Sequence, residues 1–91
     1  MTKNNVIYDE EDLEMLSDLK DAKENGLDFI FTYRGNSYRI EFVSGIVLAY
    51  MEKENAMEFR FQNIDDLMEH YMIDGEPFKN IIPEIDSYEF F

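Results

Sequence analysis

The hydrophobic pattern of residues 27–43, LDFIFTYRGNSYRIEFV, places the strongest constraint on the fold of this chain. Apolar side chains occupy every second position on both sides of a short polar segment, as expected for two strands that each have one apolar face. The polar segment contains Gly35 and Asn36, which tolerate the positive φ angles of tight hairpin turns. The sequence therefore predicts a β-hairpin with an aromatic face formed by Leu27, Phe29, Phe31, Tyr33, Tyr38, Ile40 and Phe42.

A helix is predicted immediately before this hairpin, over residues 10–24. Asp9 suits the N-cap position, and the carboxylates that follow it favour the first turn because the helix dipole is positive there. Asn25 and Gly26 form a typical helix end. The apolar stripe of this helix, at helical spacing, comprises Met15, Leu16, Leu19 and Ala22.

The remaining segments complete an α+β pattern. The apolar run 46–51 predicts a third strand, and the alternation over 57–62 predicts a fourth. Asn63 suits the N-cap of a helix over about 64–71, and Pro77 suits the first position of a short helix that ends before Pro83. We expect one domain, 1–91, with residues 1–8 flexible. Its architecture would be an antiparallel meander of three to four strands, an N-terminal helix on the aromatic face, and two short C-terminal helices covering an edge or the other face.

The composition limits the classes of partner. The chain contains 21 Asp and Glu residues against 8 Lys and Arg, a formal net charge of −13. Direct binding to nucleic acid or to an anionic membrane requires clustered cations, so this balance argues against both and favours a basic protein as partner. Cysteine is absent, which excludes disulfides and thiolate metal ligands. Because the N-terminal residues lack signal-peptide features and no stretch is long and apolar enough to span a bilayer, we expect a cytoplasmic protein.

No set of residues has the spacing of a catalytic or metal-binding motif. The single histidine, His70, is expected on the solvent side of a helix, without partners at ligand spacing. The acidic segments 65–66 and 74–76 lack the twelve-residue pattern of an EF-hand, and no serine lies in a nucleophile-elbow sequence. The sequence therefore predicts a protein that is not an enzyme and that uses no metal or cofactor.

The negative charge is concentrated in the predicted helices. Residues 9–24 carry eight acids and two lysines, and residues 64–91 carry eight acids and one lysine, whereas residues 25–63 carry five acids and four bases. Such a surface either keeps the protein soluble or imitates a nucleic-acid backbone and occupies the cationic groove of a DNA- or RNA-binding protein. The second interpretation is the leading hypothesis. The predicted partner-binding residues are Asp9, Glu10, Glu11, Glu14, Asp18 and Asp21 in the first helix and Asp65, Asp66 and Glu69 in the second.

In its small size, its acidity and its α+β pattern, the chain resembles the small acidic inhibitor proteins of bacteriophages and other mobile elements. These include anti-CRISPR and anti-restriction proteins that mimic DNA. The resemblance covers this overall character and no matched motif, so it assigns no role to any residue. It implies an inhibitor that acts by binding a nucleic-acid-binding protein.

A structural or regulatory homo-oligomer, in which the acids serve only solubility, is the alternative hypothesis. It rests on the predicted strand 46–51, which is apolar on both faces: Val47, Ala49 and Met51 would share one face, and Ile46, Leu48 and Tyr50 the other. If the helices leave one of these faces uncovered, a second subunit is the expected cover.

The acidic, aromatic tail EIDSYEFF permits two interpretations. Its ending resembles the partner-recruiting peptide of bacterial single-stranded-DNA-binding proteins, which would make it a docking peptide. We favour the other interpretation, in which Tyr88 and Phe90 or Phe91 pack back onto the sheet or the second helix, because exposed terminal aromatics favour association.

Overall fold

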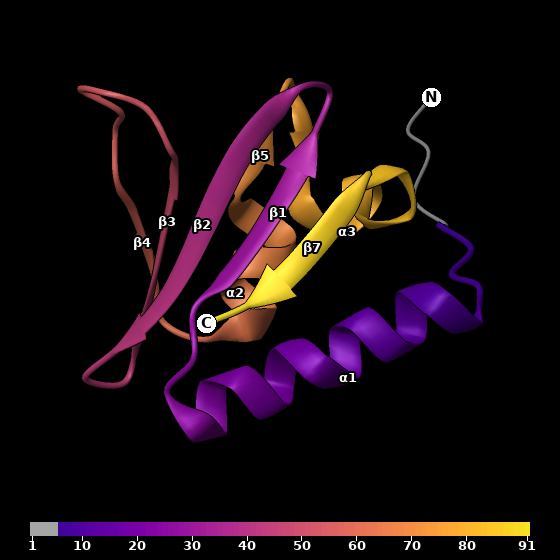
Figure 1. Ribbon diagram of the computed structural model, residues 1–91, viewed down its shortest axis with the longest axis horizontal. Coiled ribbons are helices and arrows are strands. Elements are labelled where there is room, and N and C mark those ends of the chain that lie inside the picture. Colours follow the sequence, from indigo (N-terminus) through magenta and orange to yellow (C-terminus); the bar gives the residue numbers. More distant parts are fainter. Residues whose placement is uncertain (1–5) are drawn as a thin grey trace.

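The computed structural model describes residues 6–91 and contains one five-stranded antiparallel sheet with its helices on one face (Figure 1). The strand order is β4-β3-β2-β1-β7, and β5 and β6 form a separate two-stranded hairpin. The elements are α1 (Glu10–Asn25), β1 (Phe29–Tyr33), β2 (Asn36–Val43), β3 (Ile46–Met51), β4 (Phe59–Phe61), α2 (Ile64–His70), β5 (Met72–Ile73), β6 (Glu76–Pro77), α3 (Phe78–Ile81), the 3₁₀ helix η1 (Ile82–Glu84) and β7 (Ser87–Phe90). The predicted α+β class is confirmed.

Helix α1 begins and ends where its capping residues predict. The Asp9 side chain accepts a hydrogen bond from the backbone N–H of Asp12, and the Asp12 carboxylate accepts one from the N–H of Asp9, which together form a capping box. Gly26 ends the helix in the left-handed conformation with φ 70°, which its missing Cβ permits. The buried residues of α1 are Asp12, Met15, Leu19 and Ala22.

The hairpin of β1 and β2 is present, but its turn is shorter than predicted. Tyr33 pairs with Asn36, so the connection is the two-residue loop Arg34-Gly35, with φ angles of 52° and 81°. Asn36 was predicted in the turn and instead begins β2. A two-residue loop with both φ angles positive matches the right-handed twist of the strands, and this preference outweighs the suitability of Asn for the turn.

The core lies on the aromatic face of the sheet. Phe29, Phe31 and Ile40 have no exposed surface, and Phe31 contacts Phe78 of α3 with ring centroids 5.5 Å apart. Leu19 of α1 and Leu67 of α2 belong to the same buried cluster. The C-terminal helices therefore pack on the same face as α1. The predicted placement over an edge or the opposite face is wrong, because large apolar side chains alternate mainly toward one side of β1 and β2.

The C-terminal tail forms the fifth strand, which was not predicted. Strand β7 pairs antiparallel with β1, and Phe90 lies against Phe29 with ring centroids 5.0 Å apart. Tyr88 contacts the same ring at 5.7 Å. The preferred interpretation of the tail, packing onto the sheet, is therefore confirmed. The sheet consequently has one strand more than the three to four expected.

Three further boundaries differ from the predictions. Strand β4 covers only Phe59–Phe61 of the predicted 57–62, because the β3–β4 connection continues to residue 58. Pro77 precedes α3 instead of starting it, and Pro83 lies inside η1. The predicted flexibility of residues 1–8 falls partly on 1–5, outside the described residues. Tyr8 is half-buried, and its hydroxyl donates to the backbone carbonyl oxygen of Lys79 at 2.7 Å.

Candidate protein-binding surface

An acid-lined cleft lies between the first half of α1 and the segment that leads into β7. It encloses about 410 Å³. Its apolar wall includes Met15, Ile82 and Ile85, and no Lys or Arg of the described residues lines it. The carboxylates that line it are those of Asp9, Glu11, Asp12, Glu14 and Asp86. The cleft therefore combines an apolar wall with a negative rim, an environment that suits cationic side chains with long aliphatic stems.

Tyr88, which lines this cleft, lies in a region of negative electrostatic potential. Burial raises the pKa of its hydroxyl above the ordinary value, and the carboxylates of Asp18, Glu14 and Glu11 raise it further. Each of these carboxylates opposes the formation of a phenolate, so all three act on the same region. Glu11, Glu14 and Asp18 therefore form one group on the flank of α1 that faces β7, here called the acidic flank.

The other predicted acids of α1 do not join this group. At 100° per residue, Glu10 and Asp21 lie opposite the buried stripe and face solvent. Asp9 lines the cleft but also caps α1. Of the six predicted residues of α1, Asp9, Glu11 and Glu14 thus line the cleft and a fourth, Asp18, lies near Tyr88 beside it. The other two lie on the outer surface of α1. The sequence did not predict Asp12 and Asp86 as partners in this site.

The predicted acids of α2 form a weaker candidate because two of them already have partners. Asp66 accepts from the backbone N–H of Gln62 and interacts with His70 at 2.8 Å, and both contacts lower its pKa. Glu69 forms an ion pair with Lys79 at 2.8 Å. Only Asp65 of this group has no ion pair or side-chain hydrogen bond among residues 6–91. The α2 acids therefore mainly stabilise the helix and its contact with α3.

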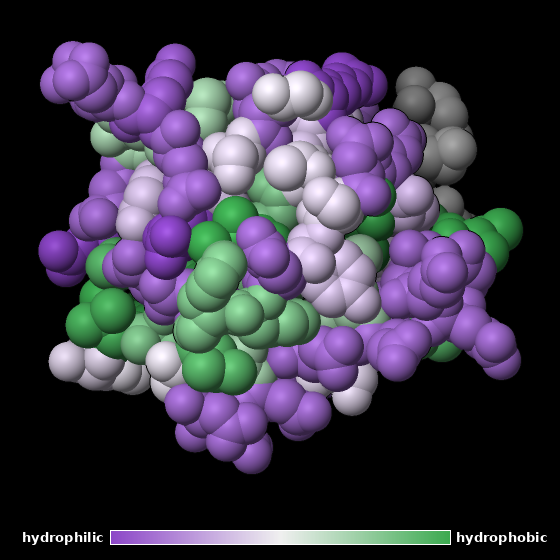
Figure 2. Space-filling model, in the orientation of Figure 1, coloured by the Kyte–Doolittle hydropathy of each residue, from purple (hydrophilic) through white to green (hydrophobic). Residues whose placement is uncertain are grey.

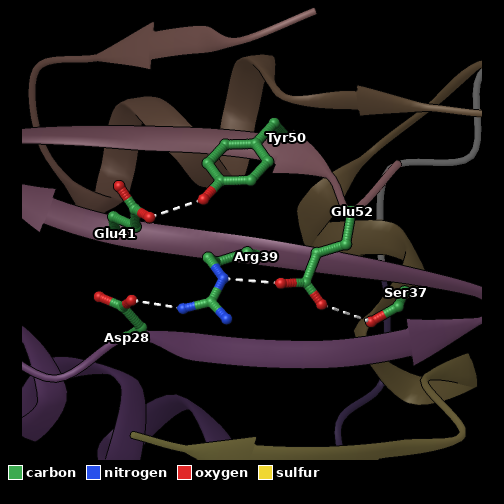
Figure 3. A network of polar contacts seen from close by, with 6 residues as sticks. All are labelled: Asp28, Ser37, Arg39, Glu41, Tyr50 and Glu52. Carbon is green, nitrogen blue, oxygen red and sulfur yellow. Dashed lines mark hydrogen bonds and ion pairs between the residues drawn. The ribbon is translucent and has the colours of Figure 1, made fainter. Parts of the chain in front are cut away.

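The face of the sheet that points away from the aromatic core carries a polar network, which the sequence analysis did not predict (Figure 3). Arg39 donates from Nη1 to Asp28 at 2.6 Å and from Nε to Glu52 at 2.7 Å. Tyr50 donates to Glu41 at 2.6 Å, and burial together with this carboxylate raises the Tyr50 pKa to about 12. The alternation in 27–43 places Asp28, Arg39 and Glu41 on the polar sides of the two strands. Their contacts depend on the register of β1 with β2 for Asp28 and Arg39, and on the register of β2 with β3 for the others.

No helix of the described residues covers this face, which is turned toward the viewer in Figures 1 and 2. Ile46, Leu48 and Tyr50 are half-buried on it, as the alternative hypothesis requires, whereas Val47 and Ala49 are buried in the core. Figure 2 shows hydrophobic residues grouped at its lower left and hydrophilic residues over α1 at its lower right. The molecule therefore presents two different surfaces, one acidic and one partly apolar.

The exposed methionines border a third surface feature. Met57 and Met72 line an apolar pocket of about 200 Å³ beside β4, together with Phe59 and Tyr71. Met15, in contrast, is buried in the core. The lining of the pocket comes from β2, β3, the β3–β4 connection, β4, the end of α2 and β5.

Comparison with known proteins adds no relative: no protein-family model, no curated protein and no solved structure matches this chain. Within residues 6–91, no group of three or more His, Asp or Glu side chains is arranged to hold a metal ion. None of the helices described is long and apolar enough to cross a membrane. The function must therefore be argued from the surfaces alone.

Proposed function

We propose that this chain is a non-enzymatic protein-binding domain that inhibits a DNA- or RNA-binding protein by occupying its basic groove. The acids of α1 would take the place of nucleic-acid phosphates. The cleft supports this proposal most directly, because its carboxylates lie together without a cation of the described residues beside them. Asp9 and Asp12 are engaged in the helix cap, and binding of a cationic partner would relieve the repulsion among the carboxylates of the cleft.

The charge density of α1 also supports mimicry. The helix has 16 residues and seven acids, and at about 1.5 Å per residue this gives one carboxylate per roughly 3.4 Å of axis when all sides of the helix are counted. A single strand of B-DNA carries one phosphate per about 3.4 Å. Lys20 and Lys23 reduce the net density toward the C-terminal end of the helix, so the first half of α1 is the better imitation.

The test is affinity capture of nucleic-acid-binding proteins on the immobilised chain, followed by elution with salt and with duplex DNA. We expect bound proteins to be released by DNA and to elute at moderate salt, because exposed charges are screened beyond about 10 Å at 0.1 M salt. The variant Glu11→Gln/Glu14→Gln/Asp18→Asn should lose most of the captured protein.

A matched control carries the same charge change elsewhere: Glu54→Gln/Glu58→Gln/Glu76→Gln, three exposed acids that belong neither to the acidic flank nor to the lining of the cleft. It should retain capture. If DNA fails to displace the bound protein, or if both variants lose binding equally, mimicry by α1 is wrong.

A second candidate function is a homo-oligomer formed through the uncovered face of the sheet. Ile46, Leu48 and Tyr50 lie there, and no helix within residues 6–91 covers them, which is the condition on which the alternative hypothesis depends. Sedimentation velocity at micromolar concentration separates the two candidates. Association that Leu48→Lys abolishes would support the oligomer, and a monomer at all concentrations would remove it.

A further inference from the structure

Strand β7 has a free edge. Asp28 and Phe91 exchange two backbone hydrogen bonds, of 2.9 Å and 3.0 Å, so they form a hydrogen-bonded pair at the end of the β1–β7 ladder. Because such pairs alternate along antiparallel strands, Glu89 also directs its backbone N–H and C=O toward β1. Tyr88 and Phe90 then direct theirs away from the sheet. Within residues 6–91, no strand pairs with β7 on that side.

This edge is less protected against pairing with a basic strand than the opposite edge of the sheet is. Edge strands are normally kept short, or carry Lys, Pro or a bulge. The opposite edge of the sheet follows this rule: β4 has three residues, Arg60 lies within it, and Asp66 accepts from the N–H of Gln62 just beyond it. Strand β7, SYEF, is one residue longer and contains neither Lys nor Pro, and three of its four residues are exposed. Its one charged residue is the acid Glu89, which repels acidic strands but not a basic peptide. The edge is therefore available to an extended peptide.

The surroundings of the edge indicate the charge of that peptide. The acidic flank, Glu11, Glu14 and Asp18, lies beside Tyr88, and the acid-lined cleft continues along 85–88. Tyr88 pairs with Phe31 on the helix-covered face of the sheet, so a strand added beyond β7 would present alternate side chains to α1. Those alternate positions favour Lys or Arg, whereas the positions between them would lie on the uncovered face beside Glu89.

We propose that β7 and the acidic flank of α1 form a docking site for an extended basic peptide, which adds a sixth strand to the sheet with Lys or Arg at every second position. This inference rests on the proposed function, because it names the element of the basic partner that α1 contacts. Backbone hydrogen bonds to Tyr88 and Phe90 would fix the register, and the acids would select the charge.

The test uses four acetylated, amidated synthetic peptides. The first is Lys-Thr-Lys-Val-Lys-Thr-Lys, with alternating lysines. The second has the same composition with its four lysines in one block. The other two are forms of the first peptide. One is N-methylated on the backbone nitrogens of its lysines, and the other on the backbone nitrogens of the residues between them. Binding is measured by titration calorimetry at low salt, and amide hydrogen exchange of Tyr88 and Phe90 is followed by NMR.

We expect the alternating peptide to bind at least about tenfold more tightly than the block peptide. In the alternating peptide all four lysines face the acids, whereas in the block peptide only half of them do. One methylation pattern should abolish binding and the other should be tolerated, because only alternate N–H groups pair with the edge. Exchange of the Tyr88 and Phe90 amides should slow on binding. Glu11→Gln/Glu14→Gln/Asp18→Asn should weaken binding about tenfold, whereas Glu10→Gln/Asp21→Asn/Glu24→Gln, on the outer surface of α1, should weaken it less.

Equal affinity for the alternating and block peptides, or equal effects of the two methylation patterns, would overturn this inference. A captured protein that depends on the acidic flank but leaves the exchange of Tyr88 and Phe90 unchanged would also overturn it, while leaving the proposed function intact. Capture that is insensitive to DNA and to the α1 acids would instead remove the proposed function.

Discussion

Arg39 joins three strand segments of the uncovered face through two carboxylates. Asp28 precedes β1 and Glu52 follows β3, so the guanidinium of Arg39 in β2 connects both neighbours of its own strand (Figure 3). The Arg39 side chain is 26% exposed, which shields both ion pairs partly from water. The hydrogen bond from Arg39 holds the pKa of Glu52 below its ordinary value of 4.5.

This lowered pKa makes the contribution of Glu52 to stability dependent on pH. A carboxyl whose pKa is lower in the folded than in the unfolded state stabilises the fold above the unfolded value, and this contribution disappears as the pH falls through the folded value. Glu52→Gln should therefore lower the free energy of unfolding by roughly 0.5–1 kcal/mol at neutral pH. In urea titrations, the difference between the two proteins should shrink toward zero as the pH falls below the folded-state pKa of Glu52. A difference that persists unchanged there would contradict this origin.

At the scale of elements, the sequence predicted the helix and the hairpin whose limits are set by neighbouring residues. Helix α1 was predicted within one residue because Asp9 and Gly26 cap it. The hairpin was predicted because its alternation continues through both strands. The turn at Arg34-Gly35 and the β7 strand were missed because each depends on pairing: Tyr33 with Asn36 in one case, and the tail with a strand more than fifty residues earlier in the other. The sequence of the tail alone does not show which distant strand it pairs with.

The acidic site shows the same limit. The sequence predicted that α1 is acidic, and the positions of Glu11, Glu14 and Asp18 on one flank follow from helical periodicity. That this flank faces the tail follows only from the pairing of β7 with β1. The partners that occupy Asp66 and Glu69 also come from the tertiary structure, since Lys79 lies in another helix.

Removal of β7 tests how much the tail contributes to the fold. Deleting residues 87–91 exposes Phe29 to solvent and leaves the backbone of β1 unpaired on one side. Loss of about 2–3 kcal/mol from the two aromatic contacts should lower the melting temperature by about 10–20 °C in a domain of this size. Phe91→Ala is the control, because that side chain is 62% exposed and its loss should have little effect. An unchanged melting temperature after the deletion would show that β7 does not stabilise the domain.

At the scale of the whole molecule, the acids far outnumber the cations that could neutralise them. The ion pairs among residues 6–91 engage Asp28, Glu52, Asp66, Glu69 and Asp74. Most of the 21 acids therefore have no cationic partner among the residues that the structure describes. This surplus is concentrated on α1 and the C-terminal segment, so the folded chain brings like charges together and repels itself.

Self-repulsion of this kind should make the protein more stable in salt. Between about 0.02 M and 0.5 M NaCl the screening length falls from about 20 Å to about 4 Å, which weakens repulsion over the whole surface more than it weakens a few close ion pairs. We therefore expect the melting temperature to rise by a few degrees over this range, measured by circular dichroism.

Two substitutions on α1, Glu14→Lys and Asp21→Lys, should raise the melting temperature at low salt and flatten its dependence on salt. The neutral pair Glu14→Gln and Asp21→Gln should have about half the effect, because each position then changes by one charge instead of two. A melting temperature that falls as salt is added would mean that the ion pairs around Arg39 outweigh the repulsion among the acids of α1.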